Sequence, residues 1–221
     1  MKEDSRASGA GFFPKMRFEE FAAERRLERF AEGYRGVIYT FVERGQRWAV
    51  KVPSEEGLVK TFLKEAKILE FLNSKGFSFV PKLREVGEDF FVYRFLEGKP
   101  FKKVQKEVPR RLFYYYLRKI LLAAYCLDRV GVFKDEFQRP FTNVLVSGRR
   151  VYLLDFERGL LNKYWKNVPQ FLQFLVAAGV LGREEAVELG RRYKKEPKAV
   201  VKELLKRLRE AAKEENPPRV D

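Results

Sequence analysis

A carboxylate within the apolar face of an expected helix is the feature that most restricts the fold of this 221-residue chain. Over residues 57–73, apolar side chains and one acidic side chain recur at helical spacings of three and four: Leu58, Phe62, Glu65, Leu69 and Leu72. Burying a carboxylate without a cation is costly, by several kcal/mol. The fold must therefore bring a basic side chain to Glu65, unless this residue lies at the margin of the face and bends toward water.

The strand expected just before this helix carries a candidate partner for Glu65. The segment Ala49-Val50-Lys51-Val52 has the composition of a strand, and strand alternation puts Ala49 and Lys51 on one face. We therefore expect Lys51 to pair with Glu65. An edge lysine that reaches solvent is the alternative for this segment taken alone.

A pair of glycines precedes that strand. Gly33 and Gly36 lie three residues apart and open into a strand-like run over residues 37–42. Glycine lets backbone N–H groups approach phosphate oxygens because no Cβ stands in the way. Such a pair also occurs in ordinary tight turns.

Asn143 and Asp155 flank an expected hairpin. Its strands cover residues 144–146 and 151–154, with the turn near residues 147–149. Antiparallel pairing brings Asn143 and Asp155 to the same open end. Two oxygen ligands at such a place suit a hard cation such as Mg²⁺, although Asp155 is also compatible with a plain strand end.

The order of elements predicts an α+β protein with a β-rich first part, residues 1–97, and a helical second part, residues 98–221. Strands are expected over residues 37–42, 47–52, 82–86 and 90–95, and helices over residues 18–30, 57–73, 109–130, 168–180, 183–192 and 198–215. An irregular polar loop is expected over residues 133–142. We expect a cleft between the two parts.

Composition excludes several kinds of chemistry. The chain has no histidine and only one cysteine, Cys126, so histidine bases, histidine or cysteine metal sites and a disulfide framework are ruled out. No apolar stretch is long enough for a membrane span, and the first residues lack a signal core, so we expect a cytoplasmic protein. Charged residues make up 35% of the chain while Asn and Gln are scarce, a pattern typical of thermophiles.

The net charge of +15 is concentrated in two segments. Residues 101–120 carry seven Lys and Arg against one Glu, and residues 191–213 carry ten against three. Concentrated positive charge indicates a polyanionic partner such as RNA, and a solvated basic helix is the alternative. We expect RNA contacts from eight of these residues: Lys102, Lys103, Arg110, Arg111, Lys194, Lys195, Lys202 and Lys206.

In combination, these motifs resemble the protein-kinase-like superfamily over residues 31–160. Residues 31–39 resemble its Gly-rich loop with Ala31 for the first glycine, Ala49-Val50-Lys51 its phosphate-binding strand, and Glu65 the partner of the strand lysine. Residues 92–98 resemble its hinge, and Asp155-Phe156-Glu157 its metal-binding motif. The resemblance implies a bilobal kinase-like fold with a small β-rich N-lobe and a reduced helical C-lobe. It also implies Mg²⁺ on Asn143 and Asp155, and ATP at the following residues: Gly33, Tyr34, Arg35, Gly36, Ile38, Ala49, Lys51, Arg94, Phe95 and Leu96.

The catalytic loop departs from the family pattern. Gln138 stands five residues before Asn143, where the family has its catalytic Asp. The segment Lys134-Asp135-Glu136-Phe137 resembles the family signature with two extra residues before Asn143. Glu136 then takes the place of the base and Asp135 competes for it. Arg139 is expected to bind either the γ-phosphate or an RNA phosphate.

Arg139-Pro140 and the basic flanks are similar to the archaeal RIO-like kinases, particularly those that phosphorylate the 2′-hydroxyl of a variable-loop uridine, U47 of tRNA. The resemblance implies tRNA as the substrate and no obligate protein partner. A RIO-like Ser/Thr protein kinase would share the ATP site and is one alternative. An inactive kinase-fold module that binds RNA is another.

Overall fold

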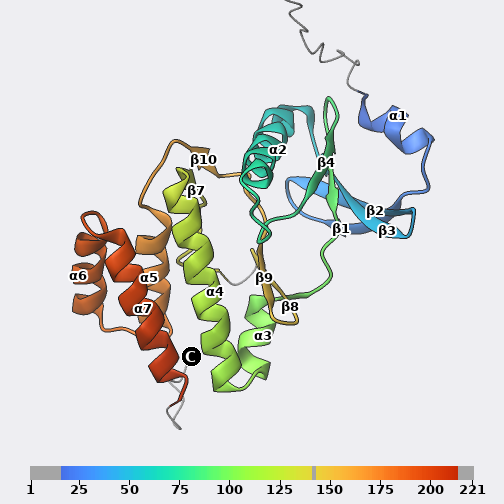
Figure 1. The fold of residues 1–221 in the computed structure, drawn as a ribbon. Helices are drawn as coiled ribbons and strands as arrows, with labels where there is room; N and C mark the ends of the chain where they lie inside the picture. The colour runs from blue at the N-terminus through green and yellow to red at the C-terminus, as the bar shows by residue number, and fades with distance from the viewer. Residues whose placement is uncertain (1–15, 141–142, 214–221) are drawn as a thin grey trace, which may run out of the picture.

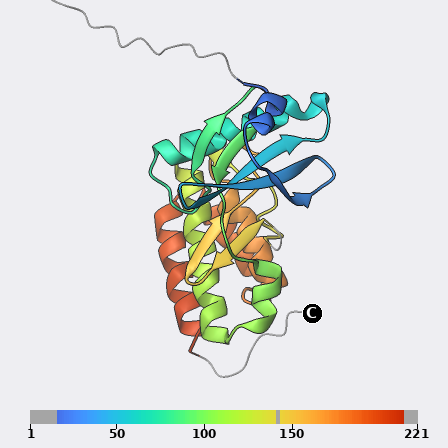
Figure 2. The same ribbon diagram turned by 90° about the vertical axis from the view of Figure 1, so that its right-hand side faces the viewer.

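The computed structural model of the chain describes residues 16–140 and 143–213. It is a mixed α+β structure with a five-stranded antiparallel sheet at one end and a group of helices at the other (Figures 1 and 2). The expected α+β class is confirmed.

The sheet has the strand order β1-β2-β3-β5-β4. Its strands are β1 (Glu28–Glu32), β2 (Gly36–Glu43), β3 (Gln46–Pro53), β4 (Leu83–Val86) and β5 (Phe91–Arg94). A two-residue turn joins β2 to β3, where Arg44 and Gly45 both have positive φ, as the twist of a tight hairpin requires. A 3₁₀ turn (Glu56–Leu58) leads into α2 (Val59–Ser74), and a short helix, α1 (Phe18–Ala23), packs Phe21 against the rings of Phe41 and Phe90.

The second part of the chain is built around the long helix α4. The helices are α3 (Phe101–Glu107), α4 (Arg110–Arg129), α5 (Asn167–Ala177), α6 (Arg183–Tyr193) and α7 (Pro197–Ala211). Two small sheets complete it: β10 (Leu160–Leu161) pairs with β7 (Val132–Phe133), and β6 (Lys99–Pro100) pairs with the hairpin of β8 (Val144–Ser147) and β9 (Arg150–Leu153). Within the described ranges, none of the helices combines the length and apolar character that crossing a bilayer requires.

One continuous hydrophobic core joins the two parts. It runs from Phe62 and Leu69 of α2 through Phe91 of β5 to Leu117 of α4 and Phe171 of α5, all of which are buried. The sheet and the helices therefore meet through packed side chains, and this fixes the position of Lys51 and Glu65 relative to the β8–β9 hairpin.

A buried carboxylate connects three helices. Asp128, in the last turn of α4, accepts hydrogen bonds from the backbone N–H groups of Lys166, Asn167 and Val168 at the start of α5. It also accepts from the hydroxyl of Tyr193, at the end of α6, over 2.9 Å. The carboxylate thereby satisfies amides that a helix start otherwise leaves without partners.

The N-terminal segment differs from expectation. The helix expected over residues 18–30 ends at Ala23, and Glu28–Glu32 is instead the edge strand β1, paired with β2. The apolar periodicity of residues 18–22 covers only one and a half turns, and pairing with β2 decides the rest. Helix α3 and the two-residue strands β6, β7 and β10 were not expected. The proposed boundary between residues 97 and 98 stays a prediction, and residues 1–15 lie outside the described residues.

Candidate functional site

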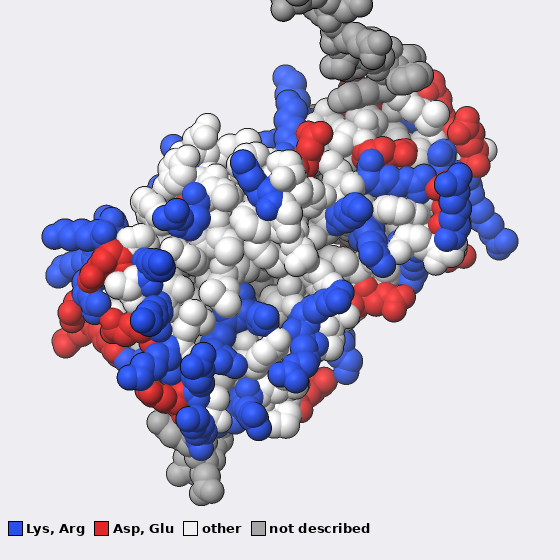
Figure 3. Space-filling view, viewed as in Figure 1, with Lys and Arg blue, Asp and Glu red and all other residues white. Residues whose placement is uncertain are grey.

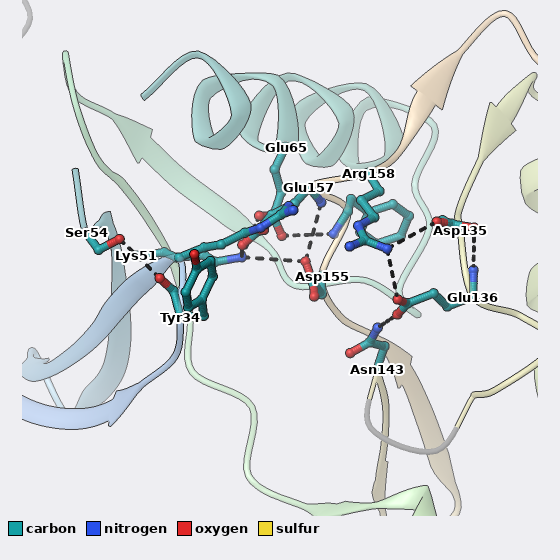
Figure 4. A network of polar contacts seen from close by, with 12 residues as sticks. Tyr34, Lys51, Ser54, Glu65, Asp135, Glu136, Asn143, Asp155, Glu157 and Arg158 are labelled. Atoms are coloured by element: carbon teal, nitrogen blue, oxygen red, sulfur yellow. Dashed lines mark hydrogen bonds and ion pairs between the residues drawn. The ribbon is translucent and has the colours of Figure 1, made fainter. Parts of the chain in front are cut away.

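The ion pair expected from the sequence is present. The Nζ of Lys51, in β3, lies 2.6 Å from an oxygen of Glu65, in α2, and both side chains are nearly buried (Figure 4). The other oxygen of Glu65 accepts a hydrogen bond from the backbone N–H of Phe156 over 3.0 Å. Burial acts to lower the pKa of Lys51, but Glu65, Asp155 and Glu157 outweigh it and the pKa is raised. Lys51 is therefore a fixed positive charge.

Glu157 is a second partner of Lys51 that the sequence reasoning did not single out. One of its carboxylate oxygens lies 2.8 Å from the Nζ of Lys51, and the other lies 3.3 Å from the guanidinium of Arg35. Glu157 thus links Lys51 to the hairpin of β1 and β2, which we call the glycine hairpin because Gly33 and Gly36 lie at its turn. Its place as the third residue of Asp155-Phe156-Glu157 was the available signal.

The mouth of the β8–β9 hairpin brings Asn143 and Asp155 together, as expected. Val144 pairs with Leu153, and the N–H of Leu154 donates to the carbonyl of Asn143 over 2.8 Å. The side chain of Asp155 is 45% exposed and lies 3.8 Å from the Nζ of Lys51. Asp155 has a φ of 60°, in the left-handed region that non-glycine residues rarely adopt.

A buried lysine holds Asp155 in that conformation. The Nζ of Lys134 donates to the backbone carbonyl of Asp155 over 2.6 Å, and Lys134 is only 3% exposed. Burial lowers the pKa of Lys134 to about 8, against the opposing influence of Asp155, Glu65 and Glu136. Sequence reasoning missed Lys134 because a loop without periodicity gives no sign of which side chain turns inward.

Glu136 and Asp135 lie on the opposite side of Asp155 from Lys51 (Figure 4). A carboxylate oxygen of Glu136 accepts from the side-chain amide of Asn143 over 2.6 Å, and Asp135 accepts from the N–H of Glu136. Arg158, also not anticipated, lies 3.6 Å from Glu136 and 3.8 Å from Asp135. Glu136 has a φ of 75°, so two of the carboxylate residues of the site, Glu136 and Asp155, have a strained backbone.

The glycine hairpin covers a cavity of about 890 Å³. Residues that line this cavity include Gly33, Tyr34, Arg35, Gly36, Ile38, Lys51, Glu65, Asn143 and Asp155. A smaller cavity of about 140 Å³ adjoins it at Asp155 and is lined by Asp135, Glu136 and Asn143. Tyr34, at the tip of the hairpin, is 99% exposed. The structure therefore groups six of the ten expected nucleotide residues with both expected metal ligands and both candidate bases.

Gly36 is required by packing, which was not the expected reason. A Cβ at this position would lie 2.3 Å from the carbonyl oxygen of Val52 and 2.6 Å from the ring of Phe62. Among the described residues, a Cβ at Gly33 would contact only the carbonyl oxygen of Gly36, at 3.9 Å. A ligand can therefore approach the backbone closely at Gly33, whereas Gly36 is needed for packing.

The four other expected nucleotide residues do not line the cavity of about 890 Å³. Ala49 is fully buried within the sheet. Arg94, Phe95 and Leu96 line a separate cavity of about 620 Å³. The N–H groups of Arg94 and Phe95 are bonded to the carbonyls of Lys82 and Arg47, so the sheet already uses these donors.

Arg139 and Arg110 also differ from expectation. Arg139 is exposed and is not among the residues that line either cavity at Asp155. Arg110 donates from Nε to the carbonyl of Ala211 over 2.8 Å and lies over the ring of Tyr114, so it ties α4 to the end of α7. The remaining expected RNA residues are exposed on the ends or outer faces of α3, α4, α6 and α7: Lys102, Lys103, Arg111, Lys194, Lys195, Lys202 and Lys206.

The arrangement supplies a fixed cation, a half-exposed carboxylate and an amide at one cavity, with a second carboxylate held by that amide. These are the groups that position a phosphate, a divalent cation and a hydroxyl. The chain matches no protein-family model and no curated protein.

Proposed function

We propose that this chain is a kinase with a bilobal, protein-kinase-like arrangement, which uses ATP and Mg²⁺ to phosphorylate an RNA hydroxyl, the 2′-hydroxyl of a tRNA nucleotide such as U47. The observation that carries the proposal is the meeting of Lys51, Glu65 and Asp155 at one cavity. They come from a strand, a helix and the end of a hairpin, in the order that the resemblance implies.

The donor set fits Mg²⁺ and a nucleotide. The carboxylate of Asp155 and the amide oxygen of Asn143 are hard oxygen ligands at the open end of a hairpin. The cavity of about 890 Å³ lies within the usual size of ligand pockets, ~300–1,000 Å³. Lys51 and Arg35 would face the phosphates, and Asn143 and Asp155 would hold the metal. When bound, ATP would supply the phosphoryl group, and Mg²⁺ would offset the negative charge of the phosphate oxygens.

The protein's own residues would position the acceptor and take its proton. Glu65 holds Lys51, and Asn143 holds the carboxylate of Glu136, which would accept the proton of the attacking hydroxyl. The acceptor oxygen would form a bond to the γ-phosphorus while the bond to the β–γ bridging oxygen breaks. Catalysis would thus rest on positioning and on stabilisation of charge.

The net charge of +15 supports RNA as the substrate class. The decisive experiment is incubation with γ-³²P-ATP and Mg²⁺ together with total tRNA and total protein, with Asp155→Asn as the matched inactive control. We expect label in the tRNA band from the wild type only. Alkaline cleavage needs a free 2′-hydroxyl, so a 2′-phosphate should leave the label in an alkali-resistant dinucleotide. Label in protein bands would instead identify a protein kinase, and label in neither would leave an inactive RNA-binding module.

A further inference from the structure

Three cations surround one aromatic ring on the outer face of α4. The guanidinium of Arg149 lies 5.0 Å from the ring centre of Tyr115, the Nζ of Lys119 lies 5.5 Å from it, and the guanidinium of Arg118 lies 5.7 Å from it. The hydroxyl of Tyr115 donates to the carbonyl of Arg149 over 3.2 Å. With Arg150, which follows in the same turn, these residues form what we call the α4–hairpin patch: Tyr115, Arg118, Lys119, Arg149 and Arg150.

The patch is held in place by backbone contacts. The hydroxyl of the neighbouring Tyr116 donates to the carbonyl of Gly148 over 2.8 Å. Two adjacent tyrosines of α4 therefore fasten the β8–β9 turn to the helix. The cations are gathered by the fold and do not depend on a flexible tail.

Two cavities continue the patch as a groove. One, of about 410 Å³, is lined by Lys119, Arg149 and Arg150, and the other is the cavity of about 620 Å³ that carries Lys82 and Arg94. They share Ser78, Arg150 and Tyr152. Of the described residues that line these two cavities, Glu97 is the one with an acidic side chain.

Among the described residues, the cations of the groove have no acidic partners. Within residues 16–140 and 143–213, no ion pair involves Lys82, Arg94, Lys119, Arg149 or Arg150, and the buried Nε of Arg118 has no hydrogen-bond partner. In Figure 3, Lys and Arg side chains gather over α4 and the β8–β9 hairpin, and acidic side chains lie mostly at the margins of this region. Like charges held this close repel one another in the free protein, and a polyanion removes that repulsion.

The hairpin connects the groove to the candidate phosphotransfer site. Asn143 stands at one end of β8 and Gly148 at the other, five residues apart. At about 3.3 Å per residue, the turn lies roughly 16 Å from the hairpin mouth. A few nucleotides of one RNA strand span such a distance.

We propose that the α4–hairpin patch and its groove bind the phosphate backbone of the RNA substrate, with an unpaired base stacking on the half-buried ring of Tyr152, which lines both cavities. RNA is favoured over an acidic protein because aromatic rings, Tyr115 and Tyr152, alternate with the cations, as in proteins that bind single-stranded nucleic acid. This inference rests on the proposed function and locates the substrate away from the eight residues that charge counting alone singled out.

The test compares two double charge reversals of equal size. Lys119→Glu/Arg149→Glu changes the patch, and Arg183→Glu/Arg191→Glu makes the same change in net charge at two exposed residues of α6 that are not among the eight expected RNA contacts. Binding of a fluorescein-labelled tRNA transcript is followed by anisotropy across a salt series without ATP. Circular dichroism verifies folding, and Lys119→Gln/Arg149→Gln replaces the reversal if that variant does not fold.

Two lost phosphate contacts should lower affinity at 0.1 M salt by about 25-fold or more and flatten the log–log salt slope by about 1.4–1.8. The α6 variant should change affinity by less than about threefold, because charges beyond a Debye length are screened. Equal effects of the two reversals on tRNA affinity, or no effect of either, would overturn the patch assignment. The same holds if the patch variant keeps its affinity for tRNA and instead loses binding to phosphatidylserine vesicles, because the patch would then be a lipid-binding surface. Wild-type protein that binds tRNA at the patch but transfers no phosphate would refute the proposed function and leave this inference standing.

Discussion

We expect the stability of the protein to rise with pH in the alkaline range because Lys134 loses its charge there. The substitution Lys134→Met should remove this pH dependence. The pKa of Lys134 is about 8 in the folded protein and 10.5 when the side chain is free in water. Between these values the unfolded chain binds more protons than the folded one, so stability rises with pH across this window. At 1.36 kcal/mol per pKa unit, the charged lysine costs the fold about 3 kcal/mol at pH 7, and the cost disappears near pH 10.5.

Guanidinium denaturation of the wild type and of Lys134→Met, at intervals from pH 7 to pH 10.5, measures this difference. Other titrating groups cancel in the comparison, because both proteins carry them. The wild type should gain up to about 3 kcal/mol relative to the variant over this range. A constant difference between the two proteins would refute the reasoning, since it would mean that Lys134 titrates alike in the folded and unfolded states.

Three further substitutions test the candidate site. Lys51→Met should abolish transfer and cost about 3–5 kcal/mol of stability, because Glu65 and Glu157 would face each other without their cation; near-normal turnover at saturating ATP would contradict the assignment. Asp155→Asn should remove Mg²⁺-dependent transfer, a loss of several kcal/mol in transition-state stabilisation, and undiminished transfer in a Mg²⁺ titration would eliminate the hairpin mouth as the metal site. Glu136→Gln should lower kcat by about 10²–10⁴-fold, more than Asp135→Asn, and the reverse order in single-turnover rates would make Asp135 the base.

The parts of the site that could be predicted are those encoded over short sequence distances. The helical stripe around Glu65 and the strand alternation around Lys51 each follow from local periodicity, and the turn fixes the register that joins Asn143 to Asp155. Each pattern needs a few neighbouring residues and one short connection. The ion pair and the hairpin mouth were therefore accessible from the sequence.

The parts that could not be predicted depend on contacts between distant segments. The side chain of Lys134 is directed inward, where it donates a hydrogen bond to the carbonyl of Asp155. The sequence of its own loop gives no sign of this contact. Arg110 contacts Ala211, 101 residues away, so a residue counted as free surface charge is a tie between helices. Charge counting found the basic segment of α4 and missed Arg149, which only the packing of the hairpin turn on Tyr115 brings beside it.

The bonds of Asp128 bear on how the helical part unfolds. Helix α5 begins without a side-chain cap of its own, and its first amides depend on a carboxylate from α4. Because Tyr193 binds the same carboxylate, α6 depends on it as well. Fraying of α5 or α6 alone would leave buried groups of the other two helices unsatisfied, which makes partial opening nearly as costly as opening all three. These helices therefore form one cooperative unit, whose slowest-exchanging amides should include those of residues 166–168.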